Sequence, residues 1–263
     1  MLRRLFASVI LLAGCLLASL SQAADKVGVV LMHGKAGDPS HLRSLADDLT
    51  AAGYLVATPT MPWSAARRYD GSLDEAHAEI DATVAELKRQ GARKIVVAGH
   101  SMGANTAIGY AATHPGLVDA LIALGPGQTV EGAVFRDRLG ASVARARNLI
   151  AKGRGDEPAE FDDLHLGKVG TVTATARVYL SYFNPDGLAN MPATAPRLAL
   201  PFLWTVGRAD RNMLERGSAY AFDRAQPNPS SRYVEVDADH MGTPDASRTV
   251  VLDWLGAVFA TGR

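Results

Sequence analysis

Short apolar runs alternate with longer helical patterns along this chain, and that alternation limits what it can fold into. The first run, Val27–Leu31, is rich in β-branched residues and free of charge, which is typical of a strand buried on both faces. The segments between such runs are long enough for helices, and a helical crossover joins parallel strands. The other expected strands are Tyr54–Ala57, Lys94–Ala98, Val118–Leu124, Pro201–Val206 and Tyr233–Val236. The sequence therefore predicts an α/β fold: a mostly parallel open sheet of about six strands with helices on both faces.

The alternation is interrupted by a segment of about seventy residues, 126–196. A plain loop of that length is uncommon within one domain. Helical patterns occur inside it at Val143–Lys152 and Thr173–Phe183. We therefore expect an inserted helical cap on a core that consists of residues 24–125 and 197–263.

The alternation resumes after the insertion. A helix is expected near Met213–Arg224, and a closing helix at Ala246–Phe259.

The first 23 residues have the pattern of an export signal. Arg3 and Arg4 form a positive start, and Leu5–Leu20 is almost wholly apolar or small. Small residues in Ser21-Gln22-Ala23 then occupy the two positions that a signal peptidase reads. We predict a signal peptide at 1–23 and an exported protein, periplasmic or secreted.

Two alternatives for this segment stay open. One is an uncleaved membrane anchor, although the apolar run is short for a bilayer span. The other is lipid attachment at Cys15, because Leu12-Ala13-Gly14-Cys15 resembles a bacterial lipobox. Cys15 is the only cysteine, so cleavage at Ala23 would leave no disulfide, no thiol nucleophile and no thiolate metal site.

The composition and the absence of certain motifs argue against several classes of binding partner and cofactor. Formal net charge is zero and no basic stripe occurs, which argues against nucleic acid. Gly34-Lys35 lacks the upstream glycine and the following Ser or Thr of a P-loop, and no G-x-G-x-x-G follows the first expected strand. No H-E-x-x-H or comparable cluster is present. We expect no cofactor, no metal and no stable membrane span, whereas the oligomeric state stays open.

The run Gly99-His100-Ser101-Met102-Gly103 is the most informative motif. It directly follows an expected strand and directly opens an expected helix. A serine on so tight a turn lies in a strained backbone region, and the flanking glycines relieve the crowding. Its hydroxyl then projects at the carboxyl end of the strand, where open α/β sheets place their ligands.

A serine nucleophile needs a base, and the base needs an acid that orients it. His240 follows the last expected strand, and Asp210 follows the strand before it, so both lie at the same edge of the sheet as Ser101. Asp210 precedes a helix and can instead cap it. Asp186 is the alternative acid, whereas Asp239, adjacent to the base, is expected to point elsewhere.

The oxyanion that forms during acyl transfer needs two preorganised donors. We expect one to be the backbone N–H of Met102, at the start of a helix. The other is the backbone N–H of Lys35, in the glycine-bearing loop after the first strand. His33 in that loop is interpreted as structural rather than catalytic.

In order and context, these motifs resemble those of the α/β-hydrolase family of serine esterases and lipase-like enzymes, over roughly Val27–Phe259. The resemblance implies a catalytic triad of Ser101, Asp210 and His240, an acyl-enzyme intermediate and no cofactor. The family usually has two more strands before the first one here, so a minimal core of six strands is expected. Members that process epoxides or haloalkanes have Asp in place of Ser101, which argues against those activities.

The leading functional hypothesis is hydrolysis of a small-molecule carboxylic ester. A thioesterase, an amidase or a perhydrolase would use the same residues, and a catalytically silent binding protein is the alternative from another class. Aromatic residues are available either for a substrate pocket or for the core of the cap. These are Trp63, Tyr69, Phe135, Tyr182 and Phe183.

Overall fold

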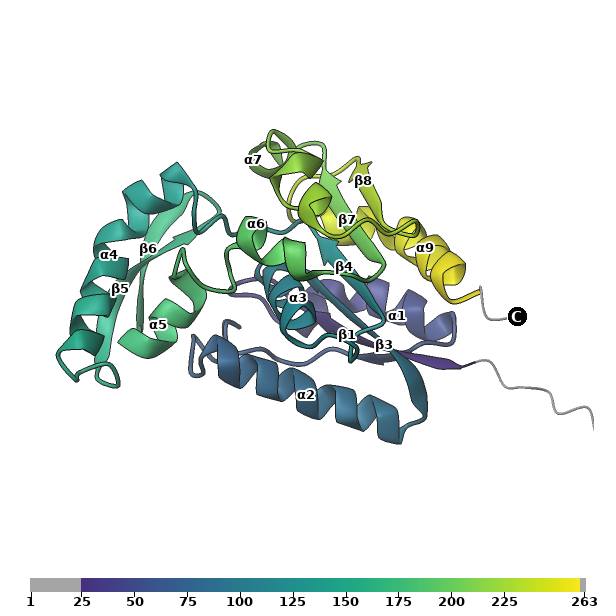
Figure 1. Ribbon diagram of the computed structural model, residues 1–263, viewed down its shortest axis with the longest axis horizontal. Helices are drawn as coiled ribbons and strands as arrows, with labels where there is room; N and C mark the ends of the chain where they lie inside the picture. Colours follow the sequence, from purple (N-terminus) through teal and green to yellow (C-terminus); the bar gives the residue numbers. More distant parts are fainter. Residues whose placement is uncertain (1–24, 261–263) are drawn as a thin grey trace, which may run out of the picture.

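Six parallel strands form one open sheet in the computed structural model, which describes residues 25–260 (Figure 1). Their order is β2-β1-β3-β4-β7-β8, and every neighbouring pair is parallel. The strands are β1 (Lys26–Met32), β2 (Leu55–Ala57), β3 (Ala92–His100), β4 (Ala120–Leu124), β7 (Phe202–Gly207) and β8 (Arg232–Val236). The predicted α/β fold class is confirmed. The predicted signal peptide, 1–23, and Cys15 lie outside the described residues.

Helices cover both faces of the sheet because the strands carry apolar side chains on both faces. Val30 and Val97 point to the face that packs against α2 (Leu73–Arg89) and α3 (Met102–Thr113). Their neighbours Val29 and Val96 point to the opposite face, which packs against α1 (Arg43–Ala51) and α9 (Arg248–Ala260). Successive side chains of a strand alternate between faces, so an uninterrupted apolar run fills two core layers at once.

The start of α2 shows how local sequence sets an element boundary. The Ser72 side chain accepts a hydrogen bond from the Glu75 backbone N–H, and the Glu75 carboxylate accepts one from the Ser72 N–H. Two backbone donors that the first turn cannot satisfy internally are thereby paired.

The segment between β4 and β7 forms the cap, which Figure 1 shows on the left, on the side toward which β1 runs. It contains helices, as expected, but also an antiparallel hairpin that the sequence did not reveal. Thr173–Thr175, expected to be helical, belongs to this hairpin, and the Thr175 side chain caps the following helix. The elements are α4 (Ala133–Ala151), β5 (Pro158–His165), β6 (Lys168–Thr175), α5 (Ala176–Phe183) and α6 (Met191–Thr194).

Aromatic side chains and hydrogen bonds hold the cap against the core. Tyr182 packs edge-on against both Trp63 and Tyr69, and its hydroxyl donates to the Gly71 carbonyl at 3.0 Å. All five aromatic residues considered for a pocket are buried. They therefore form the packed junction between cap and core, where Tyr182 also lines a small cavity.

The helix expected near Met213–Arg224 is wrong in extent. The structure has the short α7 (Arg211–Leu214) and two separate 3₁₀ turns, at Ser218–Tyr220 and Phe222–Arg224. Gly217 lies between α7 and the first of these turns and has φ 63°, a conformation that ends a right-handed helix. A further short helix, α8 (Thr243–Ala246), precedes α9. Within residues 25–260, no helix combines the length and apolarity that crossing a bilayer requires.

Candidate active site

Ser101 occupies a sharp turn between β3 and α3. Its backbone lies at φ 53° and ψ −117°, which a residue with a Cβ adopts only under strain. A Cβ on Gly99 would lie 2.3 Å from the Gly103 carbonyl carbon, and one on Gly103 would lie 2.4 Å from the Met32 oxygen. Both glycines of the motif are therefore sterically required, and the strained turn projects Ser101 beyond the carboxyl end of β3.

The structure brings Ser101, His240 and Asp210 together at that edge of the sheet. His240 Nε2 lies 3.0 Å from Ser101 Oγ, and His240 Nδ1 lies 2.6 Å from Asp210 Oδ2. The His240 and Asp210 side chains are only 18% and 11% exposed, so the pair is shielded from most of the solvent. Because one ring nitrogen faces the carboxylate, the other is free to accept the serine proton.

Three carboxylates were candidates to orient the imidazole, and only Asp210 contacts it. Asp210 stands at the N-cap position of α7, yet its side chain makes no capping bond. The exposed Asp186 binds Arg147 at 2.8 Å instead. Asp239 accepts a hydrogen bond from the Gly242 N–H at 2.7 Å, which stabilises the turn after His240.

The loop after β1 lies against Ser101. A Cβ on Gly34 would be 3.1 Å from Ser101 Cβ, a tight contact that shows how closely the loop approaches this residue. In the same loop the Ala36 N–H donates to the Trp63 carbonyl at 2.9 Å. Within the described part of the chain, the backbone N–H groups of Lys35 and Met102 have no protein acceptor. Two donors therefore remain available beside Ser101.

His33 fits the structural interpretation. It is fully buried, its Nδ1–H donates to the Gly34 carbonyl at 2.8 Å, and its Nε2 accepts from the Met61 N–H at 3.1 Å. Burial lowers the pKa of His33, which keeps the ring neutral, as that pairing requires. The ring stabilises the loop that carries Lys35.

Sequence reasoning missed His100, which supports the site from the motif itself. Its Nε2–H donates to the His240 carbonyl at 2.9 Å, and the two rings lie 4.9 Å apart. Burial lowers the pKa of His100 to about 4, so the ring stays neutral near pH 7. The only sequence signal was its place directly before Ser101, at the first unspecified position of the G-x-S-x-G motif.

Asn105, one turn into α3, is a second residue that was missed. Its side chain accepts from the Gly127 N–H at 3.1 Å and donates to the Gln128 carbonyl at 2.8 Å. A Cβ on Gly127 would lie 2.6 Å from Ser101 Oγ. Asn105 therefore holds a backbone segment directly over the Ser101 hydroxyl.

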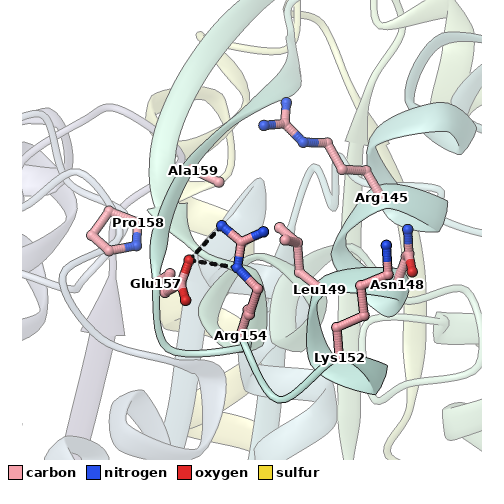
Figure 2. A pocket seen from close by; sticks show the side chains of 8 residues that line it. All are labelled: Arg145, Asn148, Leu149, Lys152, Arg154, Glu157, Pro158 and Ala159. Carbon is pink, nitrogen blue, oxygen red and sulfur yellow. Dashed lines mark hydrogen bonds and ion pairs between the residues drawn. The ribbon is translucent and has the colours of Figure 1, made fainter.

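Two hollows differ in their relation to this site. A cavity of about 10 Å³ lies beside Met102, with Gln128, Tyr182 and Leu73 among its walls. A larger hollow of about 360 Å³ lies in the cap between α4 and the start of β5, where Arg154 is paired with Glu157 (Figure 2). Its wall residue Pro158 is five residues along β5 from Asp163, or about 16 Å.

The larger hollow therefore belongs to the far end of the cap hairpin, away from the loop after β1. Among residues 25–260, no group of three or more His, Cys, Asp or Glu side chains has the arrangement of a metal site.

A parallel sheet with a strained serine at the β3–α3 turn and a histidine after the last strand defines an α/β-hydrolase fold. The family described as serine aminopeptidase, S33, matches residues 23–241, and this chain belongs to it.

Individual relatives are more distant. Lipase LipV of Mycobacterium tuberculosis is 34% identical over 94 residues, which is 36% of this chain and only a third (33%) of that protein. The monoacylglycerol lipase of Paleococcus ferrophilus is 22% identical, with a TM-score of 0.66 over 90% of this chain and 98% of its own. One of the metagenome-derived lipolytic enzymes LipS and LipT is 19% identical, with a TM-score of 0.65 over 90% and 95%. The two structural likenesses show the shared fold.

Proposed function

We propose that this protein is a serine hydrolase that cleaves carboxylic esters through an acyl-enzyme intermediate. One observation carries the proposal: Ser101 Oγ, His240 and Asp210 form a continuous hydrogen-bonded chain, with distances of 3.0 Å and 2.6 Å. A protein that only binds a ligand has no need of a strained serine in contact with an oriented imidazole.

In the first half-reaction, Ser101 Oγ attacks the ester carbonyl carbon while His240 Nε2 takes the hydroxyl proton. The carbonyl π electrons move to oxygen, and the backbone N–H groups of Lys35 and Met102 stabilise that negative charge. The oxyanion then collapses, the bond to the alcohol oxygen breaks, and His240 gives its proton to the departing alkoxide. Asp210 stays ionised and stabilises the imidazolium.

In the second half-reaction, water attacks the acyl-enzyme and His240 takes a proton from it. The same two backbone donors stabilise the second oxyanion. When the bond to Ser101 Oγ breaks, His240 returns the proton to the serine and the carboxylic acid leaves.

The relatives inform the choice of substrate. They include a lipase, a monoacylglycerol lipase and lipolytic enzymes, all of which favour an ester. The family description names an aminopeptidase, so amide cleavage is the second candidate. The cavity of about 10 Å³ beside Met102 holds about one water-sized group, which favours a short acyl chain.

The first prediction tests the nucleophile with p-nitrophenyl acetate, butyrate and decanoate, and with alanine p-nitroanilide as the amide. We expect hydrolysis of acetate to exceed that of decanoate and of the amide. Ser101→Ala removes the nucleophile, so kcat should fall at least about a thousandfold with the Tm nearly unchanged.

A fluorophosphonate probe should label the wild-type chain. It should also label the control Ser40→Ala, because Ser40 is exposed and has no part in the proposed mechanism. It should not label Ser101→Ala. Turnover by folded Ser101→Ala would contradict the assignment of the nucleophile. A folded wild type without labelling or turnover would favour the binding protein, and faster cleavage of the amide would favour the peptidase.

A further inference from the structure

The Lys35 side chain leaves the core and enters the cap. Its Nζ donates to Asp163 Oδ1 at 2.5 Å and to the Leu164 carbonyl at 2.9 Å, both on β5 of the cap hairpin. The ammonium also lies 5.0 Å from the centre of the Phe183 ring. One side chain thus joins the loop after β1 to a hairpin 128 residues further along the chain.

This ion pair is shielded from solvent. The side chains of Lys35 and Asp163 are 5% and 17% exposed. Burial lowers the pKa of Lys35, and the Asp163 carboxylate opposes that change. A buried ammonium that loses its anionic partner is strongly destabilised, so it gives up its proton or moves toward water, and either change weakens the attachment of the loop to β5.

The backbone of the same residue lies at the nucleophile. A Cβ on Gly34, one residue before, would lie 3.1 Å from Ser101 Cβ. The loop is tied to the core at Ala36, whose N–H donates to Trp63, whereas the Lys35 N–H has no acceptor among the described residues. The Gly34 carbonyl, which belongs to the same peptide plane, accepts from His33 Nδ1–H at 2.8 Å and from the Gly37 N–H at 3.2 Å. These bonds orient the plane from within the loop, and the Lys35 side chain adds its attachment to the cap.

We propose that Asp163 is a positioning residue, which holds the Lys35 side chain and thereby aims the Lys35 backbone N–H at the oxyanion formed on Ser101. The proposal rests on the proposed function, since it needs a reaction that forms an oxyanion there. It gives this one contact of the cap hairpin a role in catalysis: the Lys35 N–H is held in place only while Asp163 stays paired with the Lys35 side chain.

The test measures kcat and KM for p-nitrophenyl acetate in four variants. Asp163→Asn removes the anion with little change in shape, and Asp163→Glu keeps the charge. Asp162→Asn is the matched control, because the neighbouring carboxylate on the same strand binds Ser142 of α4 instead. Lys35→Met combined with Asp163→Asn removes both charges, so no buried ion is left unpaired.

We expect Asp163→Asn to lower kcat about tenfold to a hundredfold with KM within about twofold, since loss of an oxyanion donor costs about a hundredfold or more. Both half-reactions pass through an oxyanion, so kcat reports the effect whichever of them is slower. Asp163→Glu should recover most of the activity, and Asp162→Asn should keep wild-type kcat. The double variant should fold and keep a low kcat, because the attachment of the Lys35 side chain to β5 is then missing.

Wild-type kcat in either Asp163→Asn or the double variant overturns the proposal. Equal losses in Asp163→Asn and Asp162→Asn also overturn it, because they would reflect general damage to the cap. Ser101→Ala, measured in parallel, separates the proposed hydrolase activity from the proposed positioning role of Asp163. If it is inactive while Asp163→Asn is normal, the hydrolase assignment survives and the positioning role fails.

Discussion

At the scale of single residues, the site depends on which of several aspartate carboxylates contacts the His240 imidazole. Asp186, Asp210 and Asp239 all carry the same carboxylate, yet Asp210 alone lies within hydrogen-bond distance of His240. Asp210 also stands where a helix usually takes a capping bond, and it makes none. The carboxylate is therefore directed to the histidine at the expense of local helix stability.

The next prediction concerns this carboxylate. Asp210→Asn can present an N–H to His240 Nδ1, which would force the imidazole into the tautomer that cannot accept the serine proton. We expect kcat for p-nitrophenyl acetate to fall about a thousandfold or more while the protein stays folded. Asp186→Asn, the control, should keep wild-type kcat. Near-normal turnover in Asp210→Asn would mean that another group orients His240.

At the scale of elements, the junction of β3 and α3 is set by how closely backbones approach. The first turn of α3 lies on the end of β1, where a Cβ on Gly103 would meet the Met32 and His33 carbonyl oxygens at 2.4 and 2.7 Å. Both contacts are with backbone, which cannot rotate out of the way. The contact that positions Ser101 therefore depends on the absence of one methyl group.

Gly103→Ala should consequently destabilise the protein by more than about 3 kcal/mol or prevent folding, since the overpacking is against backbone. Gly256→Ala in α9 is the matched control: nothing lies within 4 Å of its added Cβ, and the residue is exposed. That substitution should stabilise the protein by about 0.5–1 kcal/mol, because alanine favours the helix. Denaturant unfolding of both variants measures the difference. Equal effects would contradict the close approach of α3 to β1.

The cap hairpin is the element that sequence patterns concealed. The second half of β6, residues 171–175, does alternate between threonine and an apolar residue, but most of the strand is exposed and Ala174 is its one buried residue. The alternation is short and directly precedes α5, so the segment was predicted as part of a helix. Its turn places Leu166 at φ 48° and Gly167 at φ 77°. A turn with both residues at positive φ usually carries Asn-Gly or Asp-Gly, and leucine there gave no signal.

At the scale of the whole molecule, neutral histidines are built into the core. His33, His77 and His100 are all buried. Burial is the largest cause that lowers their pKa values, to about 4 for both His77 and His100. The Nε2 atom of His77 is buried without a hydrogen-bond partner. The fold therefore tolerates these rings only while they are uncharged.

Acid should consequently unfold this protein progressively. In the unfolded chain a histidine takes up its proton near pH 6.5, whereas His77 and His100 in the folded chain take theirs near pH 4. Between these values the unfolded state binds more protons, so the free energy of unfolding falls as pH falls. Each ring contributes about 3 kcal/mol across this window.

Urea unfolding at pH 7.5, 6 and 5 measures this loss of stability. His77→Leu also removes the unpaired nitrogen. It should reduce the slope of the free energy of unfolding against pH by the amount that one proton contributes. A free energy of unfolding that stays constant from pH 7.5 to 5 would show that the buried rings take up protons in the folded state as readily as in the unfolded state.

The sequence alone determined the sheet, because an apolar run such as Val27–Leu31 can only be buried on both faces, and helices must then cover it. It also determined the strained turn at Ser101, since the glycines on either side act locally. Pairings across the chain were decided by the tertiary structure: Asp210 with His240, His100 with the His240 carbonyl, and Lys35 with Asp163. Local patterns report on neighbours within a few residues, whereas these contacts join groups 30, 140 and 128 residues apart, and only the completed fold selects which polar groups meet.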